Sequence, residues 1–379
     1  MAAPTGQGGR SDCASVAAAA RIMQEGSGIK SNTYEYRLWL KRRNHKNLDR
    51  RTKKKAAIRA ARTREINHNT AIKAAPNYNV AARRIEFTAP SNFSFIDSPG
   101  ETIEFFNGII SFITNRLNYG KNLYIDISCI KNLTIDALMY LLAIVNNMNG
   151  KIRNKFSISG NAPRDPAIRK LFNESGFYSF VNYTGTEPIT QNADTVQIVS
   201  GHESDNSLAK HICDFVMAKS GLDRKACRFI YVMMIEMMAN AYKHAYNGYD
   251  FLYPRWYCFV KFLKEENTIA FTFMDTGEGI PSTVRKNFAE KLDVLRIKGE
   301  HKYVISALNG DFRTATMEDY RGKGLPKIRE FCSSNKIQNM RIITNKADVT
   351  VLPSGYNSQD LTKPLKGTLF YWEINLAQC

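Results

Sequence analysis

The chain has 379 residues, an apolar content of 44% and a formal net charge of +18. This length exceeds what one hydrophobic core usually supports, so two folded units with tails are expected. The composition is that of a globular protein. The longest apolar run, LTIDALMYLLAIV, contains Asp136 and is too short for a membrane span, which excludes a transmembrane protein.

The start of the chain and the cysteines indicate the compartment. The leader MAAPTGQGGRSDCASVAAAA lacks the basic region and apolar core of a signal peptide, and we expect it to be disordered. The seven cysteines are odd in number and scattered, without a C-x-x-C pair. They indicate a reducing, cytoplasmic location and no zinc site.

Residues 1–84 are expected to form a disordered, basic N-terminal arm. Its segment 41–65 contains twelve Lys or Arg residues against Asp49 and Glu65, a net +10 of the total +18. Such a segment would release counterions on binding nucleic acid. It would contact the phosphate backbone rather than the bases, because it has no aromatic residues for stacking on bases. An acidic protein and an anionic membrane surface are the alternative partners, and a solvated tail is the ordinary interpretation.

Residues 85–183 alternate strand and helix patterns, which predicts a small α/β domain with a parallel or mixed sheet. The expected strands are 92–96, 121–128 and 154–160, and the expected helices are 98–117, 134–148 and 165–177. A polar stretch without periodicity, 182–195, marks the predicted domain boundary.

Residues 196–379 are expected to form a second domain, a layered α/β sandwich. It begins with two helices that end at Gly221 and Gly248, and a loop-rich segment precedes a helix near 324–334. The expected strands are 255–263, 268–275, 340–345, 348–352 and 367–375.

The second of these helices contains three polar residues, Glu236, Asn240 and His244, at intervals of four. Residues four apart lie on the same helix face, so a carboxylate, an amide and an imidazole form one stripe on a Met-rich helix. Satisfied polar groups in a core would give the same pattern. A polar ligand is the functional interpretation of this stripe.

Three further motifs follow in order. Asp275 ends a predicted strand and is followed by Gly277 and Gly279; R-G-K-G-L then places glycines before a helix, and K-G-T opens the last predicted strand. A strand-end carboxylate can accept a hydrogen bond from an exocyclic amine, and backbone N–H groups at a helix start can bind phosphate. Each motif alone is common in turns.

Together, E-x-x-x-N-A-x-K-H, D-x-G-x-G-I, G-x-G-L and G-T resemble the N box, the two glycine boxes and the closing G-T of the GHKL (HATPase) superfamily over residues 196–376. This superfamily includes gyrase, MutL, histidine kinases and anti-sigma serine kinases, and its domains have the Bergerat α/β sandwich fold. The resemblance implies binding of ATP with Mg²⁺. Many of the resembled domains pair, so a homodimer is possible.

The resemblance also implies roles for individual residues. Asn240 would be the magnesium ligand, Glu236 the general base, and Lys243 and His244 would lie toward the phosphates. Asp275 would recognise the adenine amine, with help from Thr368. The lid of the nucleotide pocket would lie between Pro281 and Arg321. Lys323 could reach a phosphate. The other residues implied at the pocket and its lid are Gly277, Gly279, Gly322, Gly324 and Leu325.

Residues 88–181 are similar to STAS domains of the anti-sigma-factor-antagonist type, in which a strand ends in Asp-Ser-Ser before a helix. Here Thr134, Ile135 and Asp136 occupy those three positions. The usual phosphoacceptor hydroxyl is therefore absent. Asp136 could mimic a permanently charged state, or it could cap the helix.

The sequence thus predicts a regulatory protein of the partner-switching type, with a protein partner and a switch operated by Mg²⁺ and ATP. If Glu236 activates a protein hydroxyl, the domain is a serine/threonine kinase; if it activates water, the domain is an ATPase. A sensor histidine kinase is disfavoured, because no H-E-x-x-x-P motif occurs. The alternative is a non-enzymatic adaptor, associated with nucleic acid, that uses ATP as a structural ligand.

Overall fold

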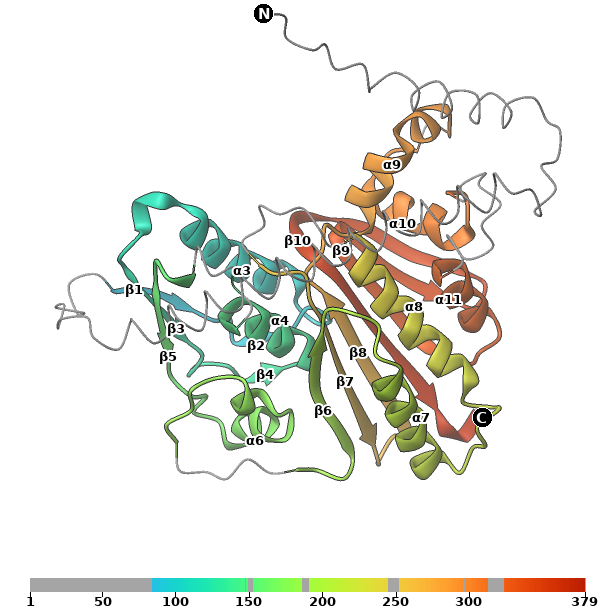
Figure 1. Ribbon diagram of the computed structural model, residues 1–379, viewed down its shortest axis with the longest axis horizontal. Coiled ribbons are helices and arrows are strands. Elements are labelled where there is room, and N and C mark those ends of the chain that lie inside the picture. Colours follow the sequence, from blue (N-terminus) through green and yellow to red (C-terminus); the bar gives the residue numbers. More distant parts are fainter. Residues whose placement is uncertain are drawn as a thin grey trace, which may run out of the picture. The chain divides into compact units, whose positions relative to one another are not determined.

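A computed structural model of the protein shows a five-stranded antiparallel sheet at the centre of the described residues (Figure 1). Its strands, in spatial order, are β6 (Thr195–Gly201), β7 (Trp256–Leu263), β8 (Thr268–Asp275), β10 (Gly355–Asn375) and β9 (Gln338–Leu352). Each neighbouring pair is antiparallel. The last strand of the sequence is therefore an inner strand of this sheet.

The structure describes residues 84–146, 148, 153–185, 191–244, 252–295, 297–312 and 324–378, but not the side chains of 243, 244, 289–295 and 378. These residues all belong to one compact unit, Asn79–Cys379. The predicted basic arm, including 41–65, lies outside the described residues except for Arg84, which begins strand β1. Among the helices that the structure describes, none is long and apolar enough to cross a membrane.

Both faces of the central sheet are buried. On β7, Trp256, Cys258 and Val260 belong to one core, whereas Tyr257 and Phe259 belong to another. This division follows from the alternation of side chains along a strand. Because consecutive residues are almost all apolar, the sequence of β7 is typical of a strand covered on both sides.

Helices α7 (Asn206–Ser220), α8 (Arg228–His244) and α11 (Gly324–Ser333) cover one face of the sheet (Figure 1). Asp205 caps α7, and Gly221 at φ 70° ends it with an N–H bond to the Met217 carbonyl, as predicted for this glycine. The predicted cap Gly248 lies outside the described residues. Two further helices, α9 (Ile280–Leu295) and α10 (Glu300–Asn309), connect β8 to the region of α11.

The other face of the sheet is covered by α3 (Pro99–Thr114) and α4 (Ile135–Asn146). These helices also cover a small parallel sheet of β1 (Arg84–Thr88), β3 (Asn122–Asp126) and β5 (Ser157–Gly160), in the order β1-β3-β5. The remaining elements here are β2 (Asn92–Phe93), β4 (Asn132–Leu133), α6 (Pro166–Glu174) and the 3-10 turns η3 (Arg116–Asn118) and η4 (Phe177–Ser179); η5 (Leu376–Gln378) follows β10.

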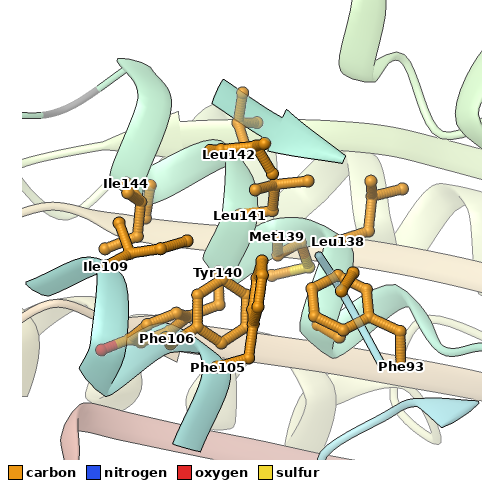
Figure 2. Packing of buried hydrophobic residues seen from close by; sticks show 14 of the residues in the cluster. Phe93, Phe105, Phe106, Ile109, Leu138, Met139, Tyr140, Leu141, Leu142 and Ile144 are labelled. Atoms are coloured by element: carbon orange, nitrogen blue, oxygen red, sulfur yellow. The ribbon is translucent and has the colours of Figure 1, made fainter. Parts of the chain in front are cut away.

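The core between α3, α4 and the central sheet is continuous. It contains Phe93, Phe105 and Phe106 beside the α4 residues Leu138 to Ile144, and the ring centroids of Phe106 and Tyr140 are 4.7 Å apart (Figure 2). The Tyr140 hydroxyl lies at the edge of this cluster and donates to the Lys366 carbonyl of β10 at 3.1 Å. The same core includes Leu369 of β10, so residues far apart in sequence share one packed interior.

The coarse expectation of a mixed α/β protein is confirmed, with parallel and antiparallel sheets. The expected helices of residues 98–177 are present, and so are β7 and β8 with nearly the predicted bounds. The predicted strands 340–345 and 348–352 are one strand, β9, and the last strand begins at Gly355 rather than Gly367. Because β9 pairs with β10 on both sides of a bulge, the two segments join into one strand.

Other elements differ from the expectation. The strand expected at 92–96 is limited to Asn92–Phe93, and β1 and β6 were not predicted. The segment interpreted as loop-rich contains α9 and α10. In α9 the backbone of Phe288 is not helical, with φ −138° and ψ 29°, so the helix is kinked at this residue.

Candidate functional site

Helix α8 positions the first two candidate residues. Its methionines Met233, Met234, Met237 and Met238 are buried against the sheet and the neighbouring helices. Glu236 and Asn240 lie on a different side of the helix and are only partly buried. The polar stripe predicted from the sequence is therefore accessible at these two residues. Lys243 and His244 are the last residues of α8, but their side chains are outside the description.

The start of α11 lies against these two polar residues. A Cβ atom added to Gly324 would be 3.0 Å from Glu236 Oε2 and 3.2 Å from Asn240 Nδ2. Glycine at this position leaves room for both side chains, because any larger residue would displace them. The glycine motif and the α8 stripe are thus brought together, although Gly322 and Lys323 lie outside the described residues. Leu325 packs against the core below α8.

A lysine that the sequence analysis did not select completes this cluster. Lys327, within the first turns of α11, places its Nζ 3.4 Å from Glu236 Oε1. The two side chains are 39% and 26% exposed, respectively. A lysine one turn after a glycine motif is an ordinary helix residue by pattern, so nothing in the sequence marks it. Only the packing of α11 on α8 brings it to Glu236.

Asp275 is the last residue of β8, opposite Thr368 in the register of β10. Its carboxylate accepts hydrogen bonds from the Gly277 N–H at 2.8 Å and from the Thr368 hydroxyl. Desolvation raises the pKa of Asp275 from 3.8 to about 6, and these two hydrogen bonds oppose that rise. The remaining acceptor capacity of the carboxylate is suited to an N–H donor of a ligand.

Two residues of β9 that were not singled out in the sequence hold the loop after Asp275. The Thr344 hydroxyl accepts from the Ile280 N–H at 3.1 Å and donates to the Gly367 carbonyl at 2.9 Å. Asn345 accepts from the Ser282 N–H at 3.2 Å and donates to the Glu278 carbonyl at 3.0 Å. Their signal in the sequence is weak, since T-N at a predicted strand end also suits a simple turn.

Glycine is required at two positions of this loop region. Gly279 has φ 85°, and a Cβ there would lie 2.5 Å from Asn345 Oδ1. Gly367 has φ 101°, and its Cβ would lie 2.0 Å from the Asp275 carbonyl oxygen. Both are in the left-handed region, where side chains are disfavoured. Gly277 is buried in the same loop.

Strand register and contacts place the Glu236–Asn240 pair and Asp275 at the same end of the central sheet (Figure 1). Trp256 of β7 is in register with Asp275 on one side and with Gly201 of β6 on the other. A few residues after Gly201, the Asp205 N–H lies 3.3 Å from the sulfur of Met238, which sits between Glu236 and Asn240 on α8. One end of the sheet thus holds the carboxylate of Glu236, the amide of Asn240 and the carboxyl group of Asp275, whose pKa is raised.

Asp136, at the expected phosphoacceptor position, is only 1% exposed. Its carboxylate accepts from the Phe95 N–H at 2.9 Å and from the Thr134 hydroxyl at 2.7 Å, and desolvation raises its pKa. These bonds tie the segment after β2 to the first turn of α4. The geometry favours a structural role over an exposed mimic of a phosphorylated residue.

Comparison of the chain with known protein families and with curated proteins gives no match.

Proposed function

We propose that residues 196–379 form a GHKL-type nucleotide domain of the Bergerat fold that binds ATP with Mg²⁺. The observation that carries this proposal is the position of Gly324 against Glu236 and Asn240. A motif suited to phosphate binding and a stripe of magnesium-type ligands, distant in sequence, meet at one end of the sheet. Asp275 and Thr368, at the same end, supply hydrogen-bonding groups for a base.

The side chains of Glu236 and Asn240 are of the kinds that bind Mg²⁺. Carboxylate and amide oxygens are the protein ligands that Mg²⁺ prefers, and Glu236 and Asn240, which lie close to Gly324, carry one of each kind. Asn240 would hold the cation, which when bound would neutralise phosphate charge. Glu236 would orient and deprotonate the attacking hydroxyl or water. Asp275 would accept a hydrogen bond from the exocyclic amine of adenine.

Within the proposal, residues 85–183 are a STAS-like domain that responds to the nucleotide. The parallel sheet β1-β3-β5, with α3 and α4 on it, supports this assignment. The contacts of α3 and α4 with β10 give such a response a physical route. The protein would act as a partner switch, with ATPase or serine/threonine kinase activity. Because Asp136 is buried, the partner would bind a surface elsewhere on this domain.

Incubation of the full chain with Mg²⁺ and γ-labelled ATP tests the proposal. We expect label on a protein substrate for a kinase, or free phosphate for an ATPase. In either case Glu236→Gln should lower turnover at least a hundredfold while ATP still binds, because an amide cannot accept the proton. Bound ATP without either product would favour the alternative, an adaptor with ATP as a structural ligand.

Asn240→Ala provides the test of the site itself. It removes the proposed cation ligand from a partly exposed position, so the fold should persist while Mg²⁺-dependent ATP binding is lost. A matched control is Asn206→Ala at the start of α7, outside the proposed site. Binding that remains Mg²⁺-dependent in the Asn240 variant would show that the nucleotide site lies elsewhere.

A further inference from the structure

Lys327 has a geometry that its ion pair with Glu236 does not explain. The Nζ–Oε1 distance is 3.4 Å, which is long for a charge-assisted hydrogen bond, and the lysine side chain is 39% exposed. Exposed pairs of this kind contribute little to stability. The ammonium is therefore free to change partner without a large loss of folding free energy.

The position of the lysine is nevertheless well defined. Ile328 and Cys332 of α11 are buried in the core below α8, and Gly324 at the start of α11 lies close to Glu236 and Asn240. The backbone of α11 is thus fixed against α8 on both sides of Lys327. The side chain therefore starts from a fixed backbone and is 39% exposed, so its ammonium group can reach a ligand in solvent.

We propose that Lys327 binds the terminal phosphate of the nucleoside triphosphate and so selects the triphosphate over the diphosphate. This inference rests on the proposed function, in which Asn240 and Glu236 border the terminal phosphate. The ammonium is within one contact of Glu236, so a phosphate group beside that carboxylate also lies within its reach. A phosphate carries more negative charge than a carboxylate and offers more acceptor oxygens, so it competes well for the lysine.

The exchange has a second consequence. While Lys327 contacts Glu236, one carboxylate oxygen is occupied by the ammonium group and is not free to contact another ligand. When the lysine moves to the phosphate, the carboxylate is released. The same residue then both recognises the triphosphate and frees Glu236 for its role.

Calorimetric titration of the full chain with Mg²⁺ and either a non-hydrolysable ATP analogue or ADP tests the proposal. Lys327→Met should weaken binding of the analogue about tenfold or more and leave ADP binding within about twofold, which is the loss expected for one charged hydrogen bond. Lys327→Arg should retain most of the discrimination. The control is Lys170→Met, which removes a lysine, 73% exposed against 39% for Lys327, from an ion pair with Glu174 on α6.

A second variant separates ligand binding from a purely structural pair. Glu236→Gln removes the charge that competes for Lys327, so it should tighten binding of the analogue. If the ion pair is only structural, Glu236→Gln and Lys327→Met should change binding of the analogue equally. If Lys327→Met weakens binding of the analogue and of ADP equally, or weakens neither, the role of Lys327 is overturned while nucleotide binding stands. If the wild-type chain binds neither nucleotide, the proposed function falls, and this inference falls with it.

Discussion

Asp275 and Asp136 are both enclosed carboxyl groups with a raised pKa, yet their surroundings differ. Asp136 binds a backbone N–H and a hydroxyl that belong to segments it joins, which accounts for its acceptor atoms. Asp275 lies at a strand end beside two glycines, where a ligand can approach its free acceptor positions. The same residue type therefore serves structure in one place and suits recognition in the other.

The raised pKa of Asp275 predicts a pH-dependent stability. The pKa of its carboxyl group is about 6 in the folded chain, whereas the ordinary pKa of an aspartic acid is 3.8. The folded state thus binds more protons between these values, so the free energy of unfolding falls as pH rises through that window. Above about pH 6, the enclosed carboxylate lowers stability by on the order of 3 kcal/mol.

Asp275→Asn should remove this contribution. In urea denaturation between pH 4.5 and 8, the variant should gain stability relative to wild type as pH rises, because an amide does not ionise. Asp214→Asn, which changes an exposed carboxylate of α7, should show no such trend. A difference between wild type and the Asp275 variant that is constant across the pH range would contradict the prediction.

At the scale of elements, β10 connects the candidate site to the helices on the other side of the sheet. Thr368 and Gly367 contact Asp275, whereas Lys363 pairs with Glu104 of α3 and the Pro364 carbonyl accepts from Asn107 at 3.1 Å. Register shifts between Asp360 and Thr368 turn successive residues of this segment toward different neighbours. One irregular stretch of strand therefore contacts both layers.

Gly367→Ala should disturb this stretch severely. A methyl group there would meet the Asp275 backbone at 2.0 Å, in a conformation with φ 101° that alanine rarely adopts, and backbone atoms cannot rotate away. We expect a loss of about 3 kcal/mol or more in the free energy of unfolding, measured by chemical denaturation. Gly355→Ala on the same strand is the control, because its Cβ would meet nothing within 4 Å. Similar losses in both variants would argue against a steric cause.

The elements that the sequence predicted well are those with strong local signals. Helix α7 has a capping Asp205 and a terminal Gly221, and β8 is a largely apolar segment that ends at Asp275. In contrast, β6 follows a polar stretch and depends on pairing with β7, and α9 is interrupted at Phe288. Such elements are decided by tertiary contacts, which a single sequence does not display.

The candidate site was predicted to a similar extent. Motif order selected Glu236, Asn240, Asp275, Gly324 and Thr368, and the structure brings them to one end of the sheet. Lys327, Thr344 and Asn345 were missed, since their positions depend on how α11 and β9 pack rather than on a spacing in the sequence. The roles of all these residues stay predictions, and Gly322, Lys323 and the side chains of Lys243 and His244 also lie outside the described part of the chain.

At the scale of the whole molecule, the two layers on either side of the central sheet depend on one another. The sheet residues Tyr257, Phe259, Met274, Ile343 and Leu369 are each at most 3% exposed, and all belong to the core that α3 and α4 complete. Arg341 of β9, paired with Asp348, also donates to the Ile96 carbonyl beyond the sheet. The interface is as apolar as the interior of a single domain.

A fragment of residues 191–379 should therefore be poorly stable. Without α3 and α4 it would expose a contiguous apolar sheet face, and such a surface promotes association and dye binding. We expect aggregation or strong fluorescence of an apolar dye from this fragment, measured against residues 79–379 as the control. A monomeric fragment that unfolds cooperatively and binds no dye would show that the sheet is self-sufficient.

The inner position of β10 also determines when the protein can fold during synthesis. The other strands that the structure describes all precede β10 in the sequence, and within this described sheet β10 lies between β8 and β9 and joins them. Until the ribosome has produced β10, α3 and α4 lack much of their apolar partner surface, and contacts such as that of Tyr140 with Lys366 span most of the described chain. Contacts of such long range slow folding, so the nascent chain would keep apolar surface exposed and depend on chaperones until its last strand is made.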